Sequence, residues 1–308
     1  MSGDLDASRR VHVRAPGKLN LFFEVGAAGG DGYHDVASVY QSVSLFEDVW
    51  ASAGEGFTIS VSGDVDVSGV PLDESNLAVR AARLVTAAVG WAGGIRLEIH
   101  KGVPVAGGMG GGSADAAAAL VAVNELVGGG LTTSELHSLG SELGADVPFA
   151  LLGGTAVGTG RGDELAPALT HGRFEWVLVT NDRGLSTPEV YRTLDDLRAA
   201  ADIRPARTTP AADPAVLRAL RSGSADALGA AIRNDLQLAA VSLRPDLAEV
   251  LERGLHEGAI GGLVSGSGPT IAFLAADAAH ARELQQRLGA AGHAALHVHG
   301  PVPGARVS

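Results

Sequence analysis

Residues 107–112, GGMGGG, form the segment whose composition points most directly to chemistry. They lie between the alternating stretch GIRLEIHKGVPV, which reads as a strand, and the alanine-rich stretch SADAAAALVAV, which reads as a helix. A glycine loop that enters a helix lets backbone N–H groups approach an anion, and the helix dipole adds positive potential. The spacing fits neither the G-x-x-x-x-G-K-[ST] phosphate loop nor the G-x-G-x-x-G dinucleotide fingerprint. We therefore expect a phosphate-binding loop of another type, with a linker or a tight packing turn as the alternative.

Lys18 and Lys101 are the two lysines of the chain, and arginine supplies the rest of its 23 Lys and Arg residues. Lysine carries a compact charge and arginine a broad planar fork, so the two are not interchangeable. Lys18 lies between two β-rich stretches, and Lys101 closely precedes the glycine loop. We expect a specific role for each, with an ordinary surface position as the alternative.

The composition limits the classes of protein to consider. A chain of 308 residues is long enough for one large domain or two ordinary ones. The formal net charge of −12 argues against broad nucleic-acid binding. The absence of cysteine excludes disulfides, thiolate nucleophiles and cysteine-ligated metals. A polar N-terminal segment, and apolar runs shorter than the ~18 residues of a membrane span, predict a cytoplasmic protein that binds no membrane.

Hydrophobic periodicity divides the chain into two halves of mixed strands and helices, which predicts an α+β fold. Before residue 168 we expect β-rich stretches broken at Pro16-Gly17, a loop over 26–36, a strand that enters the glycine loop, and helices over 73–89, 113–127 and 133–143. After it we expect a strand over 174–180, a strand-turn-strand over 261–275, a last strand over 294–300, and helices over 186–200, 214–222, 225–233, 245–257 and 277–289. Residues 301–308 are predicted to be a loose tail.

The glycine loop resembles the nucleotide-binding loop of a known superfamily. PVAGGMGGGSADAA (104–117) is similar to the ATP-binding loop of the GHMP kinases, with Met109 in place of a leucine and Ala114 in place of a second serine. APGKLNLFFEV (15–25) and GLVSGSGPTIAFL (262–274) resemble the first and third motifs of the same superfamily, so the resemblance covers nearly the whole chain. It implies the two-domain GHMP kinase fold: a ribosomal-protein-S5-like ATP-binding domain over 1–168, a C-terminal GHMP kinase domain over 169–308, and an active site in the cleft between them.

In the GHMP kinases this loop wraps the phosphates of ATP, so the resemblance implies ATP, as MgATP, as the phosphoryl donor. The residues implied for nucleotide binding are Pro104, Val105, Ala106, Gly107, Gly108, Met109, Gly110, Gly111, Gly112, Ser113 and Ala114, together with Lys101, Asp115 and Asn76. Asp115 is equally well interpreted as an acid of the first helical turn, which the dipole favours. In some relatives the serine at the position of Ser113 helps to hold Mg²⁺, and the metal ligands stay unassigned.

A closer resemblance concerns the acceptor. DGYHDVASVYQSV (31–43) and LGADVPFALLGG (143–154) resemble the branch of the superfamily that phosphorylates the 2-hydroxyl of 4-(cytidine 5'-diphospho)-2-C-methyl-D-erythritol, in the non-mevalonate route to isoprenoid precursors. The resemblance implies that Asp146 accepts the hydroxyl proton or orients the hydroxyl, and that Lys18 is its electrostatic partner. Two alternatives remain: a GHMP kinase with another acceptor, and a nonenzymatic metabolite sensor. The DGYH run disfavours the first, and the Lys18–Asp146 pair disfavours the second.

The same resemblance assigns residues to the cytidine-diphosphate polyol. Tyr33 and Tyr191 are implied to stack on the two faces of the base, and His34 to hydrogen-bond its edge. Asn20 follows Lys18 by two residues on the same strand face and is implied to bind the polyol hydroxyls. The alternatives are a buried Tyr33–His34 pair that supports a turn, and a helix-core position for Tyr191.

The third motif adds Gly266, Ser267 and Gly268, in a turn that closes over the site. The remaining histidines show no metal-ligand spacing, and we expect His297 and His299 at the surface. The partners implied are therefore the two small-molecule substrates, with the protein a monomer or a weak homodimer.

Overall fold

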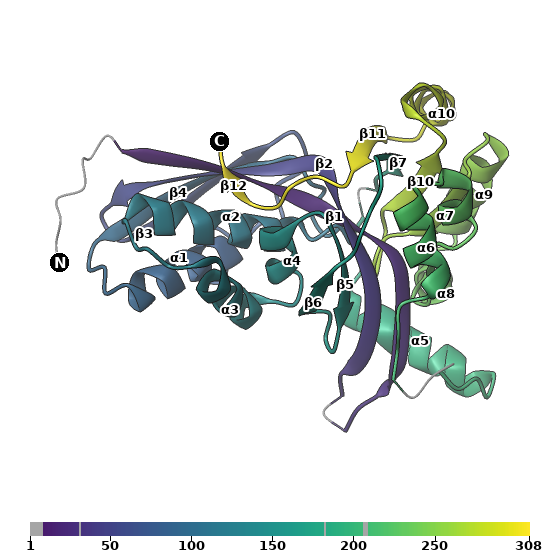
Figure 1. The fold of residues 1–308 in the computed structure, drawn as a ribbon, viewed down its shortest axis with the longest axis horizontal. Helices are drawn as coiled ribbons and strands as arrows, with labels where there is room; N and C mark the ends of the chain where they lie inside the picture. Colours follow the sequence, from purple (N-terminus) through teal and green to yellow (C-terminus); the bar gives the residue numbers. More distant parts are fainter. Residues whose placement is uncertain (1–8, 31, 182, 206–208) are drawn as a thin grey trace.

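The computed structural model describes residues 9–30, 32–181, 183–205 and 209–308, which form two sheets with helices packed against them (Figure 1). The larger sheet has the order β12-β1-β2-β4-β3, with β5 and β6 continuing from β2 and β8 beside β1. Its strands are β1 (Arg10–Ala28), β2 (His34–Gly54), β3 (Phe57–Gly63), β4 (Gly94–Lys101), β5 (Thr155–Thr159), β6 (Glu164–Pro167), β8 (Arg233–Asn234) and β12 (Arg306–Val307). The smaller sheet has the order β11-β7-β10-β9, from β7 (Phe174–Val179), β9 (Gly261–Val264), β10 (Ile271–Ala275) and β11 (Ala295–Gly300).

The helices divide between the two sheets in the same way (Figure 1). Beside the larger sheet lie α1 (Leu77–Ala88), α2 (Gly111–Leu126), α3 (Thr133–Leu143) and α4 (Val147–Leu152). In the second half lie α5 (Thr187–Ala200), α6 (Pro214–Ser222), α7 (Ala225–Gly229), α8 (Gln237–Leu243), α9 (Asp246–His256) and α10 (Ala278–Ala290). Within the described ranges, no helix is long and apolar enough to cross a membrane.

Helix α2 holds the glycine loop against the larger sheet. Its alanines at 116–119 are fully buried, and their small side chains let the helix pack closely on β1 and β2. The next helix, α3, begins as predicted at Thr133, because Thr132 and Glu135 form a capping box. Both helices therefore confirm expectations based on local pattern, and α2 fixes where the loop must lie.

Strand β1 is continuous, so the predicted break at Pro16-Gly17 is wrong. Pro16 has no N–H to donate, and the pairing with β2 accommodates it in a register shift between Pro16 and Gly17. The long β1–β2 hairpin reaches both halves of the chain. Leu19 and Phe22 of β1 share a buried cluster with Trp176 of β7, and this common core holds the two sheets beside each other.

Residues 301–308 do not form the predicted loose tail. β12 pairs antiparallel with β1, with Val307 opposite Val13 (Figure 1). The N–H of Gly154 also donates to the carbonyl of Val302 at 2.8 Å. The proposed division at residue 168 stays a prediction, but the strand pairing returns the last residues to the sheet of the first half.

Several elements differ in extent from the sequence predictions. The loop over 26–36 contracts because β1 continues to Ala28 and β2 begins at His34. The helix over 225–233 ends at Gly229, and Arg233, its last predicted residue, begins β8 beside β1. The short helices α4 and α8 were not predicted, since six or seven residues contain too few turns for a periodic signal.

Candidate active site

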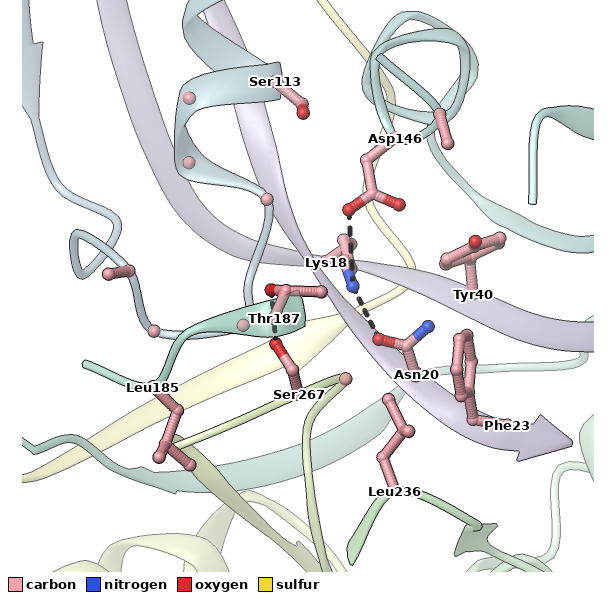
Figure 2. Close-up of a pocket in the computed structure, with 18 of the residues that line it drawn as sticks. Lys18, Asn20, Phe23, Tyr40, Ser113, Asp146, Leu185, Thr187, Leu236 and Ser267 are labelled. Atoms are coloured by element: carbon pink, nitrogen blue, oxygen red, sulfur yellow. Dashed lines mark hydrogen bonds and ion pairs between the residues drawn. The ribbon is translucent and has the colours of Figure 1, made fainter. Parts of the chain in front are cut away.

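A cavity of about 510 Å³ opens beside the glycine loop, with walls from both halves of the chain (Figure 2). The first half contributes the loop together with Lys18, Asn20, Tyr40 and Asp146. The second half contributes Leu185, Thr187, Tyr191, Leu236, Gly266 and Ser267. Polar groups from strands, helix starts and turns thus converge on one space, which is typical of a ligand site.

Lys18, Asn20 and Asp146 form the polar centre of this cavity (Figure 2). Lys18 Nζ lies 3.6 Å from Asp146 Oδ2 and donates to Asn20 Oδ1 at 2.6 Å. Asn20 Nδ2 in turn donates to Ser38 Oγ at 2.8 Å, which fixes the orientation of the amide. Lys18 and Asn20 are buried, whereas the Asp146 side chain is 30% exposed. The carboxylate is therefore available to accept a proton, and the adjacent ammonium can stabilise a negative charge.

Two glycines show why the loop needs bare backbone. Gly108 has φ +74, and a Cβ there would lie 2.3 Å from the carbonyl oxygen of Ser265. Gly110 has φ +71 and is the N-cap of α2, with no side chain capping the helix. The first N–H groups of α2 thus remain able to bind an anion. Of the predicted loop residues, the cavity is lined by Pro104, Ala106, Gly107, Gly108, Gly110, Gly111, Gly112 and Ser113, whereas Met109 and Ala114 are fully buried.

A second cavity, of about 240 Å³, adjoins the first and shares Leu77, Pro104, Ala106 and Gly112 with it. Val105, Asn76, Lys101 and Asp115 also line this space. The Asn76 side chain already caps α1, because its Oδ1 accepts from the N–H of Ala78 at 2.9 Å. Its contact with a nucleotide stays a prediction.

Lys101 ends in a buried cluster with Glu47 and Asp115, which we call the acid–lysine cluster. Its Nζ lies 2.6 Å from Glu47 Oε1 and 2.6 Å from Asp115 Oδ2, and all three side chains are at most 4% exposed. A Cβ on Gly111 would lie 2.8 Å from Glu47 Oε1, so the cluster lies directly beneath the start of α2. Asp115 lies beyond the first turn of α2, and its alternative as a first-turn acid is wrong. Direct contact between Lys101 and a nucleotide stays a prediction.

The acid–lysine cluster has two carboxyl groups and one cation. Burial raises the pKa of Glu47 to about 8, and the nearby charge of Asp115 adds to this rise. Burial likewise raises the pKa of Asp115. Burial alone lowers the pKa of Lys101, but the two carboxylates raise it overall. The cluster is therefore best described as an ammonium and two carboxyl groups that retain one proton near neutral pH.

This extra proton predicts a pH dependence of stability. The pKa of Glu47 is raised from 4.5 to about 8, so between these values the folded state retains a proton that the unfolded state has lost. The free energy of unfolding should therefore fall as the pH rises through this window. Glu47→Gln should remove most of that slope in urea unfolding curves measured from pH 5 to 9. The exposed Glu142→Gln is the control, and a Glu47→Gln slope equal to that of the unaltered protein would contradict the proton assignment.

Of the residues predicted to read the base, Tyr191 lines the main cavity, whereas Tyr33 and His34 are not among its lining residues. Burial, with the charge of Asp146, raises the pKa of the Tyr191 hydroxyl. The His34 ring lies 5.1 Å from the Tyr191 ring, and its Nε2 lies 2.9 Å from Asp195 Oδ1. Tyr33 is 59% exposed, so the alternative of a buried Tyr33–His34 pair is wrong. Arg161 Cζ lies 4.1 Å from the centre of the Tyr33 ring.

The third motif closes the cavity from the second half. Ser267 and Thr187 place their hydroxyl oxygens 2.8 Å apart in the cavity wall (Figure 2). Asn234 Nδ2 donates to the carbonyl of Gly266 at 2.7 Å, which holds the turn. The N–H of Gly268 donates back to the carbonyl of Ser265 at 2.8 Å, so Gly268 supports the turn behind the wall.

The sequence did not single out Tyr40, Arg161 or Thr187, which also line the cavity. Arg161 stands between two glycines in a turn. An arginine flanked by glycines is a sequence signal that could have identified it as a site residue. Tyr40 lies in an apolar strand, where nothing local distinguishes it from a core residue. His297 and His299 are half-buried, with His297 Nε2 2.7 Å from Glu175 Oε2, so their predicted surface position is wrong.

Family models match both halves of the chain. The GHMP kinases N terminal domain matches residues 76–154, and the GHMP kinases C terminal domain matches residues 216–294. A homoserine kinase from Cytophaga hutchinsonii, 18% identical, shares the fold with a TM-score of 0.75. These matches confirm the predicted α+β fold of the GHMP kinases.

Several relatives of higher identity are named as one kinase. A 4-diphosphocytidyl-2-C-methyl-D-erythritol kinase of Clavibacter michiganensis subsp. michiganensis is 53% identical over 100% of this chain and 99% of its own. The protein of that name from Leifsonia xyli subsp. xyli is 55% identical over 96% of this chain and 98% of its own. A crystal structure of 4-(cytidine 5'-diphospho)-2C-methyl-D-erythritol kinase is 32% identical, with a TM-score of 0.76 over 94% of this chain and 100% of that one. The chain therefore belongs to the 4-diphosphocytidyl-2-C-methyl-D-erythritol kinase family of the GHMP kinases.

Proposed function

We propose that the protein transfers the γ-phosphoryl group of ATP to the 2-hydroxyl of 4-(cytidine 5'-diphospho)-2-C-methyl-D-erythritol, giving the 2-phosphate and ADP. This reaction is a step of the non-mevalonate route to isoprenoid precursors. The observation that carries the proposal is the meeting of Lys18, Asn20 and Asp146 with the glycine loop in one cavity. The identity of more than 50% to two kinases of that name supports the choice of acceptor.

The geometry supports a task for each group in this reaction. The acceptor is a tertiary alcohol, which is too weakly acidic to ionise at neutral pH, so Asp146 accepts its proton as transfer proceeds. Lys18, 3.6 Å from that carboxylate, stabilises the negative charge that develops between acceptor and phosphoryl group. The N–H groups at the start of α2 bind the phosphates. Asn20, oriented by Ser38, holds the polyol hydroxyls.

The residues beside the loop also fit Mg²⁺ as part of MgATP. Ser113 reaches the cavity there (Figure 2). A hydroxyl oxygen suits Mg²⁺, which needs only one or two protein ligands when phosphates supply others. Among the residues that the structure describes, no group of three or more His, Asp or Glu side chains could hold a metal without such help. When bound, the ion neutralises phosphate charge.

The decisive test is ADP release from MgATP with single acceptors. The cytidine-diphosphate polyol, homoserine, mevalonate and galactose are offered separately to the same preparation. We expect turnover with the first compound alone. Turnover with another acceptor would leave the ATP site but reject the substrate. If no acceptor reacts although ATP binds, the result would contradict the proposed reaction and favour the alternative of a nonenzymatic nucleotide sensor.

Removing the exposed ring at Tyr33 should affect the cytidine substrate selectively. We expect Tyr33→Ala to raise KM for the cytidine substrate by about two- to tenfold, because a stacked aromatic contact contributes roughly 0.5–1.5 kcal/mol. KM for ATP should not change. Tyr33→Phe, which keeps the ring, is the matched control in the same steady-state assay. An unaltered KM for the cytidine substrate in Tyr33→Ala would reject the stacking role.

A further inference from the structure

Residues 102–110 link β4 to α2 and carry most of the glycine loop, and we call them the linking segment. The segment contains neither helix nor strand, and several of its residues line the main cavity. Because irregular backbone can adopt many conformations, its shape depends on the contacts that hold it. Both of its ends lie against one side chain, that of Glu47 in β2.

Glu47 touches the two ends through different oxygens. At the first end, the N–H of Gly102 donates to Glu47 Oε2 at 3.0 Å. At the second end lies Glu47 Oε1, because a Cβ added to Gly111 would be 2.8 Å from it. Lys101 Nζ lies 2.6 Å from the same Oε1, and the Glu47 side chain is fully buried. One buried carboxyl group therefore fixes the spacing between the end of β4 and the start of α2.

This arrangement needs an acceptor on each side of the group. Lys101 and the N–H of Gly102 are both donors, and a carboxyl group has lone pairs on both oxygens in either protonation state. An amide has one acceptor oxygen and an NH₂ group that only donates, so in Glu47→Gln the NH₂ opposes one of the two donors. Burial raises the pKa of Glu47 to about 8, so at pH 7 this change alters hydrogen bonding more than net charge.

The spacing of the two ends matters for the N–H groups that face the cavity. Residues 110–112, at the start of α2, line the main cavity, where helical N–H groups bind an anion. The middle of the loop is held separately, because the N–H of Lys18 donates to the carbonyl of Met109 at 2.9 Å. Glu47 is not among the residues that line this cavity or the adjoining one. Its influence on a bound nucleotide would therefore pass through the backbone of the loop.

We propose that Glu47 is a positioning residue that holds the two ends of the glycine loop at the spacing in which the N–H groups at the start of α2 bind the phosphates of ATP. The inference rests on the proposed function, in which this loop binds ATP. Glu47→Gln tests it, and Glu47→Asp, which keeps both acceptor oxygens on a chain one carbon shorter, is a milder second variant.

The matched control is Glu175→Gln in β7 of the smaller sheet. Glu175 is also a buried glutamate with a cationic partner, because Arg173 Nε donates to its Oε1 at 2.6 Å and its side chain is 6% exposed. Loss of stability alone should therefore appear in Glu47→Gln and in Glu175→Gln. Loss of loop positioning should appear only in the Glu47 variants.

The measurements are the dissociation constant for ATP without acceptor and KM for each substrate, at pH 7 and at a temperature where circular dichroism shows each variant to be folded. We expect Glu47→Gln to raise both the dissociation constant and KM for ATP by about tenfold, with KM for the cytidine substrate unchanged. Glu47→Asp should raise them less, and Glu175→Gln should change neither. An unchanged dissociation constant for ATP in a folded Glu47 variant, or an equal rise in KM for both substrates, would overturn the inference.

Amide hydrogen exchange gives a readout that is independent of turnover. Without ATP, we expect peptides that cover residues 101–112 to exchange faster in Glu47→Gln than in the unaltered protein, and not in Glu175→Gln. Equal exchange in all three proteins would overturn the inference while leaving the kinase reaction intact. If the unaltered protein binds ATP but does not phosphorylate the cytidine compound, the proposed reaction fails, and the ATP and exchange measurements still decide this inference.

Discussion

Asp146→Asn should lower kcat by about 10²–10⁴-fold, the range for loss of a positioned general base, while ATP still binds. The amide preserves the shape of the carboxylate at the start of α4 but cannot take the proton of the acceptor hydroxyl. Lys18 keeps its hydrogen bond to Asn20, so the rest of the site stays in place. Steady-state turnover measures the fall in kcat. The dissociation constant for ATP, measured on the same preparation, shows whether ATP still binds.

The size of the decrease in kcat distinguishes the two roles considered for Asp146, which are to accept the hydroxyl proton or to orient the hydroxyl. An amide oxygen can still accept a hydrogen bond, so a residue that only orients the hydroxyl should lose less than about tenfold in kcat when changed to Asn. The exposed Glu142→Gln is the control for a lost negative charge nearby. Unchanged turnover in Asp146→Asn would contradict both roles.

Lys101→Met should reduce the free energy of unfolding by about 3–5 kcal/mol, the usual cost of removing one partner from a buried ion pair. Glu47 and Asp115 would then be left without their cation, with side chains that are at most 4% exposed. The methionine chain fills much of the same volume, so loss of charge rather than of packing dominates. Urea unfolding at pH 7 measures the change.

A triple variant separates charge from structure. Lys101→Met with Glu47→Gln and Asp115→Asn leaves no buried charge, and we expect it to regain part of the stability lost by Lys101→Met alone. A Lys101→Met variant within about 1 kcal/mol of the unaltered protein would show that the cluster is not held by this cation.

Local pattern predicted much of the site. The glycine loop, α2 and α3 follow from residue type and spacing, because backbone freedom, alanine packing and capping act within a few residues. Lys18 and Asn20 were correctly expected on one face, because strand side chains alternate. These are short-range rules, and they hold wherever the chain is regular.

The features of the site that the sequence did not predict depend on contacts between segments that are distant in the chain. The partners of Lys101 come from β2 and α2, and only the folded sheet brings Glu47 beside Asp115. The bond between His34 and Asp195 likewise joins the first half to α5. The roles of the individual site residues stay predictions.

The pairing of β12 with β1 has a consequence for how the protein is made. β1 leaves the ribosome long before Arg306–Val307, because the whole second half lies between them in the chain. Until they emerge, the edge of β1 near Val13 lacks its partner, and an open strand edge can pair with other chains. The strand pairing of the larger sheet therefore cannot be completed when only the first half of the chain has been synthesised. Its final closure must follow synthesis of the whole second half.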